Sequence, residues 1–598
     1  MRLRIPEINL NKYQLFTIFV LFWVGLGWIG LALSLLGIFY NAILASYIFI
    51  GGIFLIYLIA FNKVKFEINH RFFLIFLLSL LAIFVFSLYT VPTIFSGRDQ
   101  GALSEAAIQL SQNHHLAFSF PAEKEFFGIY GSGPALNFPG FNYTSKGDLL
   151  TQFPLGYISW LAIFYSIFGL NGFVVANSVT FIIFLFSFYL TARYYLRASS
   201  AIATVILVLT SFIFSWFFKF TLSENLALML TWFGIYGFVM FTRNKERFYL
   251  LASLSAFTLL VFSRIEALGF LAILTAILLI KYKDWKYLLF VVIGKKLLLL
   301  LGGFALIYIF HLVVDAQSYH AMLKGLLSPF ISLGNGLQDS SSVPFIATAI
   351  YTIKVLSAYS LTGFILFGIV GFIYLWKHKK FEILIPFLIV APTFLYILHP
   401  SISADHPWML RRFVFSVIPA SILYTVWFFD WFFKKRVYFY VFTSLLLAAN
   451  LIVFAPYLTV SPNKNLLPQI KDIGSNFKNS DLVLVDRDAT GDGWSMMTGP
   501  LNFLYGKQAV YFFNPKDLNK INLKKFDSVY FIIPDANLDL YKKSGLFSKL
   551  APIKDYTIET KMLDVVTGEK QEMFGVPVIL PEQTNAVVYG KIYLLRNY

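Results

Sequence analysis

The sequence predicts an α-helical membrane protein with many spans that ends in a small water-soluble α/β domain. Only 13% of the 598 residues are charged and the mean hydropathy is +0.71, whereas soluble domains carry about 25% charged residues. Apolar runs of about 20 residues, the length that crosses the hydrocarbon core, recur along residues 13–457. Residues 459–598 have the composition of a soluble domain. We therefore expect a membrane domain over 1–458 and a second domain over 459–598.

About thirteen apolar spans are expected in the membrane domain. They lie near residues 13–36, 42–61, 71–92, 172–195, 200–218, 225–242, 248–263, 266–280, 297–313, 360–376, 381–398, 412–433 and 437–457. Basic residues collect in short loops such as Lys63–Arg71 and Lys377–Lys380, which is the positive-inside pattern of cytoplasmic loops. We expect a multi-pass protein of the plasma membrane with a cytoplasmic N-terminus. An odd number of spans then places the C-terminal domain outside.

The charge and the cysteine count exclude two classes of site. A formal net charge of +17 would suit nucleic-acid binding, but the basic residues lie in short loops between spans, so no nucleic-acid partner is expected. The chain has no cysteine, which excludes disulfides and thiolate metal sites. The outer domain must therefore be stable through the packing of its core alone.

The first long outer loop covers about residues 93–171. Within it, Ala102–Gln112 has the apolar spacing of a helix that lies along the membrane surface. Phe118–Asp148 is rich in Gly, Pro, Asn and aromatic residues and is expected to be irregular. Phe153–Phe168 is apolar but short, so we expect a helix that dips into the outer leaflet or caps it.

The C-terminal region alternates short apolar runs with helix-like segments, which is typical of a small α/β domain. The expected strands are Leu482–Asp486, Ala509–Phe513, Ser528–Pro534 and Lys591–Leu595. The expected helices are Leu466–Phe477 and Ala536–Leu550.

Charge first collects on the outer side in Phe95–Glu105, FSGRDQGALSE. Asp99 lies between Gly97 and Gly101, and glycine lets a backbone approach a substrate closely. Asp99 is therefore the candidate catalytic carboxylate, with Arg98 and Glu105 in support. The alternative is that Asp99 caps the helix that follows it, and the residues alone favour neither reading.

Two further clusters of ionisable residues come to the same outer boundary. Lys219 and Glu224 lie at the outer end of the fifth span, and Arg264 and Glu266 lie in the turn of a helical hairpin. Ionisable groups at membrane depth are usually paired or functional. For Arg264 and Glu266 we favour a mutual or interhelical salt bridge over direct catalysis.

The last outer cluster is HPSISADHPWMLRR, which contains Asp405, His406, Arg411 and Arg412. Two adjacent arginines on the outside run against the positive-inside trend. Arginine binds phosphate bidentately, so we favour a phosphate substrate here over anchoring to anionic lipid head groups.

Asp99 within GRDQG, at the start of a long first outer loop, resembles the GT-C superfold of polyprenyl-phosphate-dependent glycosyltransferases, the protein mannosyltransferase and aminoarabinose transferase type. Thr151–Gly169 resembles the Pro-containing loop helix of that family, Glu224 falls where it tends to carry a second acid, and DHPWMLRRF resembles a late motif with arginines near the lipid phosphate. The resemblance covers about residues 71–435. The chain departs from the family in two extra spans before the loop and in Gln100, where some members have a second acid.

The resemblance implies an inverting transfer of a sugar from a polyprenyl phosphate to a hydroxyl of a protein, lipid or glycan acceptor. It implies Asp99 as the base and Glu224 in a supporting role, and these two acids would hold a divalent metal, Mg²⁺ or Mn²⁺, if one is used. The groups assigned to the donor phosphate, with Asp405 in support, are Arg411, Arg412, Lys219, Arg264 and His406. The C-terminal domain is assigned to acceptor recognition.

Two other classes stay open. A transporter or flippase for a lipid-linked saccharide would share the spans and the arginines, but it predicts inverted repeats and broken helices near the midplane, and the sequence contains no visible repeat. A non-enzymatic scaffold that displays residues 459–598 would leave the outer acids unexplained. We therefore favour the glycosyltransferase.

Overall fold

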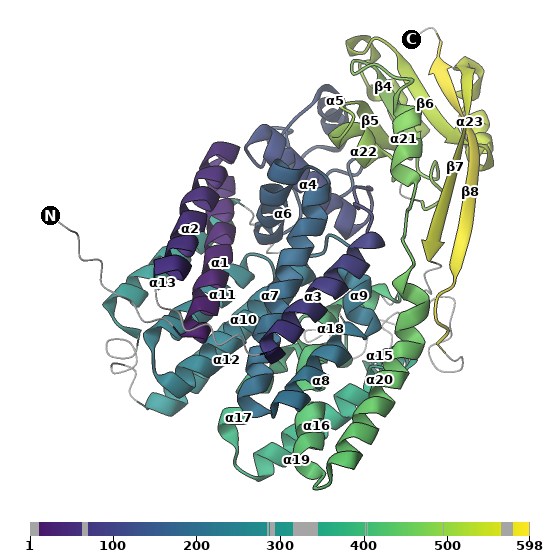
Figure 1. The fold of residues 1–598 in the computed structure, drawn as a ribbon. Helices are drawn as coiled ribbons and strands as arrows, with labels where there is room; N and C mark the ends of the chain where they lie inside the picture. Colours follow the sequence, from purple (N-terminus) through teal and green to yellow (C-terminus); the bar gives the residue numbers. More distant parts are fainter. Residues whose placement is uncertain are drawn as a thin grey trace, which may run out of the picture.

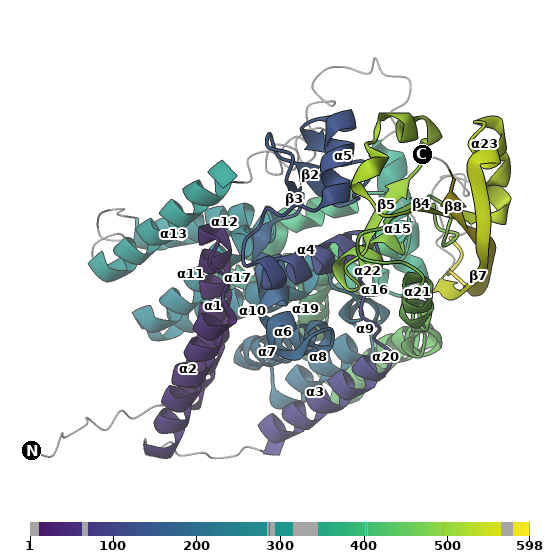
Figure 2. The ribbon, with the colours of Figure 1, turned by 90° about the horizontal axis from the view of Figure 1, so that it is seen from above.

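A computed structural model of the protein describes residues 11–61, 70–283, 286, 293–314, 345–400, 402–403, 405–493, 496–563 and 578–596. A helical body makes up most of the chain, and a domain with a β-sheet lies at one end of it (Figure 1). The first outer loop lies at the same end as this domain, so helices α4 and α5 approach the sheet from the side (Figures 1 and 2).

Seven of the described helices are long and apolar enough to cross a membrane. They are α1 (Lys12–Leu36), α2 (Asn41–Phe61), α3 (His70–Leu88), α7 (Asn171–Tyr195), α10 (Ser223–Asn244), α13 (Lys295–Val314) and α20 (Arg436–Leu458). The protein is a multi-pass membrane protein, as predicted. The side of the membrane that each terminus faces stays a prediction.

Three further helix pairs pass the same test together but are bent between their two members. The pairs are α8 (Ala198–Leu209) with α9 (Phe212–Phe218), α15 (Phe345–Ala358) with α16 (Thr362–Lys377), and α18 (Arg411–Val414) with α19 (Val417–Phe432). The described residues therefore hold seven spans, or up to ten if each pair is one span. The thirteen predicted spans are not confirmed, because hydropathy alone does not show where a helix breaks.

Three predicted spans are shorter helices. They are α11 (Arg247–Val261), α12 (Glu266–Tyr282), and α17 (Phe381–Val390), which is continued by the 3₁₀ helix η2 (Ala391–Ile397). Helix α10 is buried along its whole apolar window, whereas α2, α13 and α20 expose large apolar side chains such as Phe49 and Ile452. In lipid, the backbone N–H and C=O groups must form hydrogen bonds within their own helix, so the exposed apolar helices are suited to face lipid. Helix α10 is buried and therefore forms the centre of the helical body.

The first outer loop folds around two helices that the sequence predicts, α4 (Asp99–Asn113) and α6 (Leu155–Phe168). The part expected to be irregular also has regular structure, which is a correction. It contains α5 (Pro121–Tyr130) and an antiparallel sheet of β1 (Gly133–Pro134), β2 (Phe141–Tyr143) and β3 (Leu149–Thr151). These elements are too short to produce a periodic apolar pattern, so composition alone concealed them.

The C-terminal domain has a five-stranded sheet in the order β5-β4-β6-β8-β7. Strand β4 (Leu482–Asp486) pairs in parallel with β5 (Gln508–Phe512) and β6 (Val529–Pro534), and β8 (Gln583–Leu595) pairs antiparallel with β6 and β7 (Leu550–Leu563). Helices α21 (Leu466–Gly474), α22 (Thr498–Phe503) and α23 (Leu538–Lys543) complete the domain. The four predicted strands are confirmed. Strand β7 was missed, because exposed polar residues interrupt it.

The first outer loop contacts the C-terminal domain at the β5 edge of its sheet. The Asn137 side-chain Nδ2 donates to the Tyr511 carbonyl at 2.7 Å, and the Tyr511 N–H donates to the Asn137 carbonyl at 3.2 Å. Tyr130 donates to Asp517 at 2.5 Å, and Lys525 pairs with Glu125 at 2.6 Å. Two regions that lie far apart in the sequence are therefore joined by hydrogen bonds and an ion pair.

Candidate functional site

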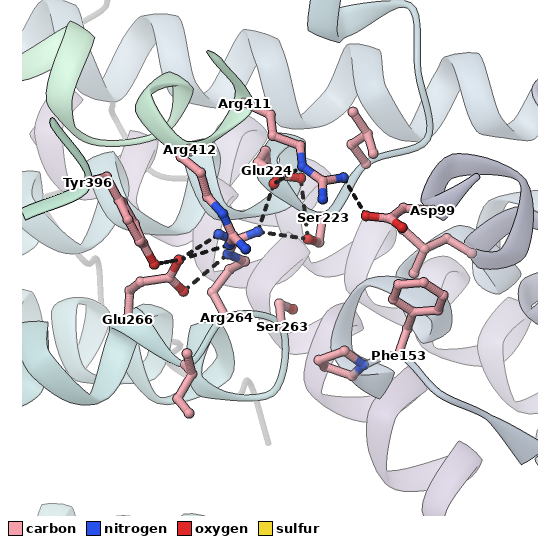
Figure 3. Close-up of a pocket in the computed structure, with 14 residues that line it drawn as sticks. Asp99, Phe153, Ser223, Glu224, Ser263, Arg264, Glu266, Tyr396, Arg411 and Arg412 are labelled. Atoms are coloured by element: carbon pink, nitrogen blue, oxygen red, sulfur yellow. Dashed lines mark hydrogen bonds and ion pairs between the residues drawn. The ribbon is translucent and has the colours of Figure 1, made fainter. Parts of the chain in front are cut away.

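A cavity of about 260 Å³ collects charged side chains from four separate parts of the chain (Figure 3). Asp99 comes from the start of α4, Glu224 from the first turn of α10, and Arg264 and Glu266 from the turn between α11 and α12. The remaining charges come from α18, and Phe153 with Tyr396 of η2 adds aromatic walls. The charged lining residues are Asp99, Glu224, Arg264, Glu266, Arg411 and Arg412.

Two glycines fix the position of Asp99. Gly97 has φ = 86°, a left-handed conformation that glycine adopts without strain. A Cβ on Gly101 would lie 1.7 Å from the carbonyl oxygen of Phe95, so only glycine lets the helix turn back onto this segment. The N-cap of α4 is Arg98, so Asp99 is the first helical residue and not the cap. Its carboxylate accepts a hydrogen bond from Nη1 of Arg411, and the side chain is 39% exposed.

Arg264 binds two glutamates in the middle of the cavity. Its Nη1 lies 2.7 Å from Glu224 Oε1, and its Nη2 and Nε donate to the two oxygens of Glu266 at 2.5 and 3.2 Å. The predicted Arg264–Glu266 ion pair is therefore present, and it is bidentate, which is the strongest geometry for such a pair. Tyr396 adds a donated hydrogen bond to Glu266 at 2.6 Å.

Arg411 and Arg412 are less fully paired than Arg264. Besides its bond to Asp99, Arg411 has its Nε 3.8 Å from Glu224, and Arg412 has its Nη1 3.6 Å from Glu266. The Nε atoms of both arginines are buried and donate no hydrogen bond to any described residue. A buried donor without an acceptor destabilises a protein by about 1–3 kcal/mol. Both side chains nevertheless line the cavity and are 19% and 20% exposed, so other N–H groups of the two guanidiniums are accessible to an anion.

A second cavity, of about 240 Å³, lies on the other side of Asp99. Asp99 and Phe153 line both cavities. The remaining walls are mainly apolar or backbone, and they come from Gly97, Arg98, Ala102, the segments 134–136 and 139–141, and Gln152. Asp99 therefore stands between a cavity rich in arginine and a cavity with few charges.

The structure places several predicted site residues outside the charged cavity. The Lys219 ammonium donates to the carbonyls of Tyr457, Leu458 and Val460 at 2.7–3.0 Å, at the C-terminal end of α20. Cations are favourable there because of the helix dipole. Lys219 is therefore a buried structural cation and does not reach the cavity, in contrast to the prediction.

His406, Asp405 and Glu105 also lie outside the two cavities. His406 is fully buried with its Nδ1 3.0 Å from the Tyr359 hydroxyl, and burial lowers its pKa to about 4, so it is uncharged near pH 7. The Asp405 carbonyl accepts from the Met409 N–H at 2.8 Å. Sequence proximity to Arg411 and Arg412 suggested a role for His406 and Asp405, but the chain turns between them.

Sequence reasoning missed Tyr396, Ser223 and Phe153 as lining residues. Ser223 Oγ lies 3.5 Å from Arg264 Nη1 and 3.4 Å from Glu224. The chain has 34 Tyr and 68 Phe residues, so no local pattern distinguishes the two aromatic residues. Ser223 directly precedes Glu224, where a serine is also typical of an ordinary helix N-cap, so the sequence does not distinguish it.

The residues assigned to a divalent metal do not suit one in this arrangement. Asp99 is bonded to Arg411, and Glu224 to Arg264. Over the described ranges, no three His, Cys, Asp or Glu side chains come together as metal ligands. Hard cations such as Mg²⁺ need several free oxygen ligands, whereas these carboxylates already neutralise guanidinium groups.

No protein-family model matches the chain, and no curated protein does. Solved structures give similarities at low sequence identity. ArnT from Cupriavidus metallidurans in the apo state has 10% identity and a TM-score of 0.47, over 87% of this chain and 98% of that one. ArnT bound to undecaprenyl phosphate has 12% identity and a TM-score of 0.46, over 86% and 97%.

The oligosaccharyltransferase AglB from Archaeoglobus fulgidus, in complex with an inhibitory peptide and a dolichol-phosphate, has 11% identity and a TM-score of 0.46, over 79% of this chain and 70% of that one. ArnT and AglB have the GT-C fold, which is the fold that the sequence motifs resemble. Identities of 10–12% concern the fold alone.

Proposed function

We propose that the chain is an inverting membrane glycosyltransferase that moves a sugar from a polyprenyl phosphate to an acceptor hydroxyl on the outer side of the membrane. The observation that carries the proposal is the pair of adjacent, partly exposed arginines, Arg411 and Arg412, in a cavity that is also lined by Asp99.

A phosphate is the anion that fits two adjacent arginines. Guanidinium groups present paired donors that match phosphate oxygens, and hydrogen bonds between charged partners are about twice as strong as neutral ones. A bound phosphate would accept hydrogen bonds from the exposed N–H groups of the two guanidiniums. Helix α18 belongs to one of the bent membrane spans, so a phosphate at Arg411 and Arg412 would have its lipid chain beside apolar helices.

Asp99 is placed to act as the general base. In the proposed reaction the acceptor oxygen bonds to the anomeric carbon, the bond from that carbon to the phosphate oxygen breaks, and the acceptor proton moves to Asp99. The transition state has oxocarbenium character, and the leaving phosphate gains negative charge that Arg411 and Arg412 stabilise. The base must contact the acceptor, which agrees with the place of Asp99 between two cavities.

The second cavity would hold the acceptor hydroxyl. Its walls carry few charges, which agrees with an uncharged nucleophile that approaches Asp99. The positive-inside pattern supports a cytoplasmic N-terminus, and the first outer loop contacts the C-terminal domain. We therefore place the cavity and this domain on the extracytoplasmic side. The acceptor class is a protein, a lipid or a glycan.

Removal of divalent metal is expected to leave the transfer rate unchanged, because Asp99 and Glu224 are already neutralised by arginines. The measurement is the turnover of reconstituted protein in EDTA, with and without added Mg²⁺ or Mn²⁺. A rate that falls in EDTA and returns with either ion would instead assign the metal-binding role to the two acids.

Substitution Arg412→Gln is expected to weaken binding of undecaprenyl phosphate about 10–100-fold, because a hydrogen bond to a charged group contributes about 1.5–3 kcal/mol. Binding is measured on protein in lipid nanodiscs. Undecaprenol, which lacks the phosphate, should bind both proteins equally. Binding of inorganic phosphate to the wild type would show a site for the head group alone, whereas its failure to bind would show that the site also needs the lipid.

Arg436→Gln is the matched control for Arg412→Gln. Arg436 also pairs with an acid, with its Nη1 2.5 Å from Asp430, but it lies at the start of α20 and outside the cavity. Undecaprenyl phosphate should bind this variant like the wild type. Equal affinity of wild type and Arg412→Gln would remove the phosphate from the cavity and the proposal with it.

The transporter alternative has one observation in its favour, which is the three bent helix pairs. Broken helices line substrate paths in many transporters. A panel of polyprenyl-phosphate-linked monosaccharides, incubated with the reconstituted protein and membranes as the source of acceptor, separates the two classes. Release of polyprenyl phosphate with a new glycosidic bond supports the transferase, and movement of the intact lipid across the bilayer without product supports the transporter.

A further inference from the structure

Phe95, four residues before Asp99, belongs to the hydrophobic core of the C-terminal domain. It is 3% exposed and lies in the same buried cluster as Leu466, Ile470, Met497 and Leu501. The predicted boundary near residue 458 therefore does not divide the protein in space. The C-terminal domain holds the segment that leads into Asp99.

Ser96 adds hydrogen bonds to the same contact. Its N–H donates to the Met496 carbonyl at 3.3 Å, its Oγ accepts from Thr498 Oγ1 at 2.9 Å, and its Oγ donates to Glu105 Oε1 at 3.1 Å. Glu105, on the second turn of α4, is 1% exposed. The start of α22 is thus bonded through Ser96 to helix α4, which carries Asp99 at its first position.

The contact leaves no space for a side chain at Gly499. A Cβ there would lie 2.0 Å from Glu105 Oε1 and 2.8 Å from Ser96 Oγ. Glycine therefore allows α22 to lie directly against the carboxyl group. On its other side, the first turn of α4 is bonded to Thr221, whose Oγ1 donates to the Gln100 carbonyl at 2.8 Å. Helix α4 is therefore held from two sides.

We propose that the C-terminal domain positions Asp99 through the α22 junction, which consists of Phe95, Ser96, Glu105, Thr498 and Gly499, and that Glu105 is the positioning residue of this junction. The domain would then be part of the machinery of the membrane cavity and not only a module for the acceptor. The inference concerns the geometry around Asp99, and it rests on the proposed function only for the role of Asp99 in transfer.

Glu105 is suited to hold this contact in its protonated form. The elements packed against α4 are α6, α22 and β3, and none of the three contains Asp, Glu, Lys, Arg or His. On α4 itself, the ionisable neighbour is Asp99, with Arg98 at the N-cap. Burial raises the pKa of Glu105 to about 8, while the hydrogen bond from Ser96 lowers it by less.

The raised pKa of Glu105 sets the direction of a pH effect. The folded protein keeps the proton up to about pH 8, whereas the unfolded chain releases it near the ordinary value of 4.5. Between these two values the folded state binds more protons, so this group makes stability fall as pH rises, and the effect ends above the folded pKa. Glu105→Gln stays uncharged and should lose this part of the pH dependence.

The test compares Gly499→Ala with Gly128→Ala, since a Cβ on Gly128 meets nothing within 4 Å. Gly499→Ala should lower kcat by about 10²-fold, the effect of a misplacement of about 1 Å, with little change in the KM for the donor. Gly128→Ala should behave as wild type. Thr498→Val removes the hydrogen bond without added volume and should act in the same direction if Gly499→Ala fails to fold.

A second readout needs no substrate. The chain has no cysteine, so spin labels at Gln112→Cys on α4 and Ser475→Cys beside α21 report one distance in the full-length protein. The distribution should be narrow in the wild-type background and broad in Gly499→Ala or Thr498→Val. An unchanged distribution in both variants overturns the proposal, and so does a broad distribution with wild-type kcat.

Glu105→Gln and Glu105→Ala complete the test. Glu105→Ala should broaden the distance distribution, and Glu105→Gln should restore it and flatten the fall of Tm from pH 6 to pH 8. A Glu105→Gln protein with the wild-type pH dependence of Tm would contradict the role of Glu105. If no donor is turned over by the wild type but the distances respond as expected, the junction stands and the transferase proposal fails.

Discussion

Substitution Asp99→Asn is expected to lower kcat for sugar transfer by about 10²–10⁴-fold, which is the range that a general base contributes. Asparagine keeps the shape of the side chain but does not accept the acceptor proton. Binding of undecaprenyl phosphate should persist, since Arg411 and Arg412 stay in place. The measurement is single-turnover release of polyprenyl phosphate from a sugar-linked donor, together with the affinity for the lipid phosphate.

The matched control for Asp99→Asn is Asp405→Asn. Asp405 was also assigned to the site from the sequence, but it lies outside both cavities, so its amide variant should turn over donor like the wild type. Wild-type turnover by Asp99→Asn would remove this carboxylate from catalysis. Loss of lipid-phosphate binding in the same variant would instead assign Asp99 a role in ordering Arg411.

Substitution Arg264→Met is expected to destabilise the folded protein by about 3–5 kcal/mol, the effect of removing one partner of a buried ion pair. Arg264 has an 8% exposed side chain and bonds two glutamates, Glu224 and Glu266, which are 2% and 6% exposed. Without the guanidinium these carboxylates would lie buried with less countercharge. The measurement is the thermal unfolding of the detergent-solubilised protein.

Two further variants check the reason for that loss. Arg436→Met removes a pair in which the arginine is 31% exposed, so its effect should be much smaller, as for partly exposed pairs. The double variant Arg264→Met, Glu224→Gln should recover part of the lost stability, because Glu266 keeps Arg412 and Arg411 keeps Asp99 as a charged partner. A single Arg264→Met protein as stable as the wild type would show that the three groups do not act as one buried network.

The membrane class and most of the secondary structure could be predicted because the signals are local. Apolar runs, basic loops and short apolar strands each occupy one stretch of sequence, and they correctly gave the helical membrane body, α4, α6 and four of the strands. The predicted number of spans is not confirmed, and β7 was not predicted. Whether an apolar run bends, or a polar strand pairs, depends on its neighbours in space.

The candidate site was predicted in part. Asp99, Glu224, Arg264, Arg411 and Arg412 do line one cavity, because each stands where an apolar run ends and charge begins. Their pairing could not be foreseen. Asp99 and Arg411 are in contact although they lie 312 positions apart in the sequence. Hydropathy alone does not fix how each helix is rotated about its axis, and this rotation decides which side chains meet.

The sequence by itself determined that this chain crosses a membrane and carries acids and arginines at the ends of its spans. The tertiary structure decided which of these charges meet. In the folded protein Lys219 binds the end of α20, His406 contacts Tyr359 in a buried position, and Glu105 belongs to the α22 junction. The physical reason is that the place of a buried polar group depends on the partner that satisfies it, and here those partners come from distant parts of the chain.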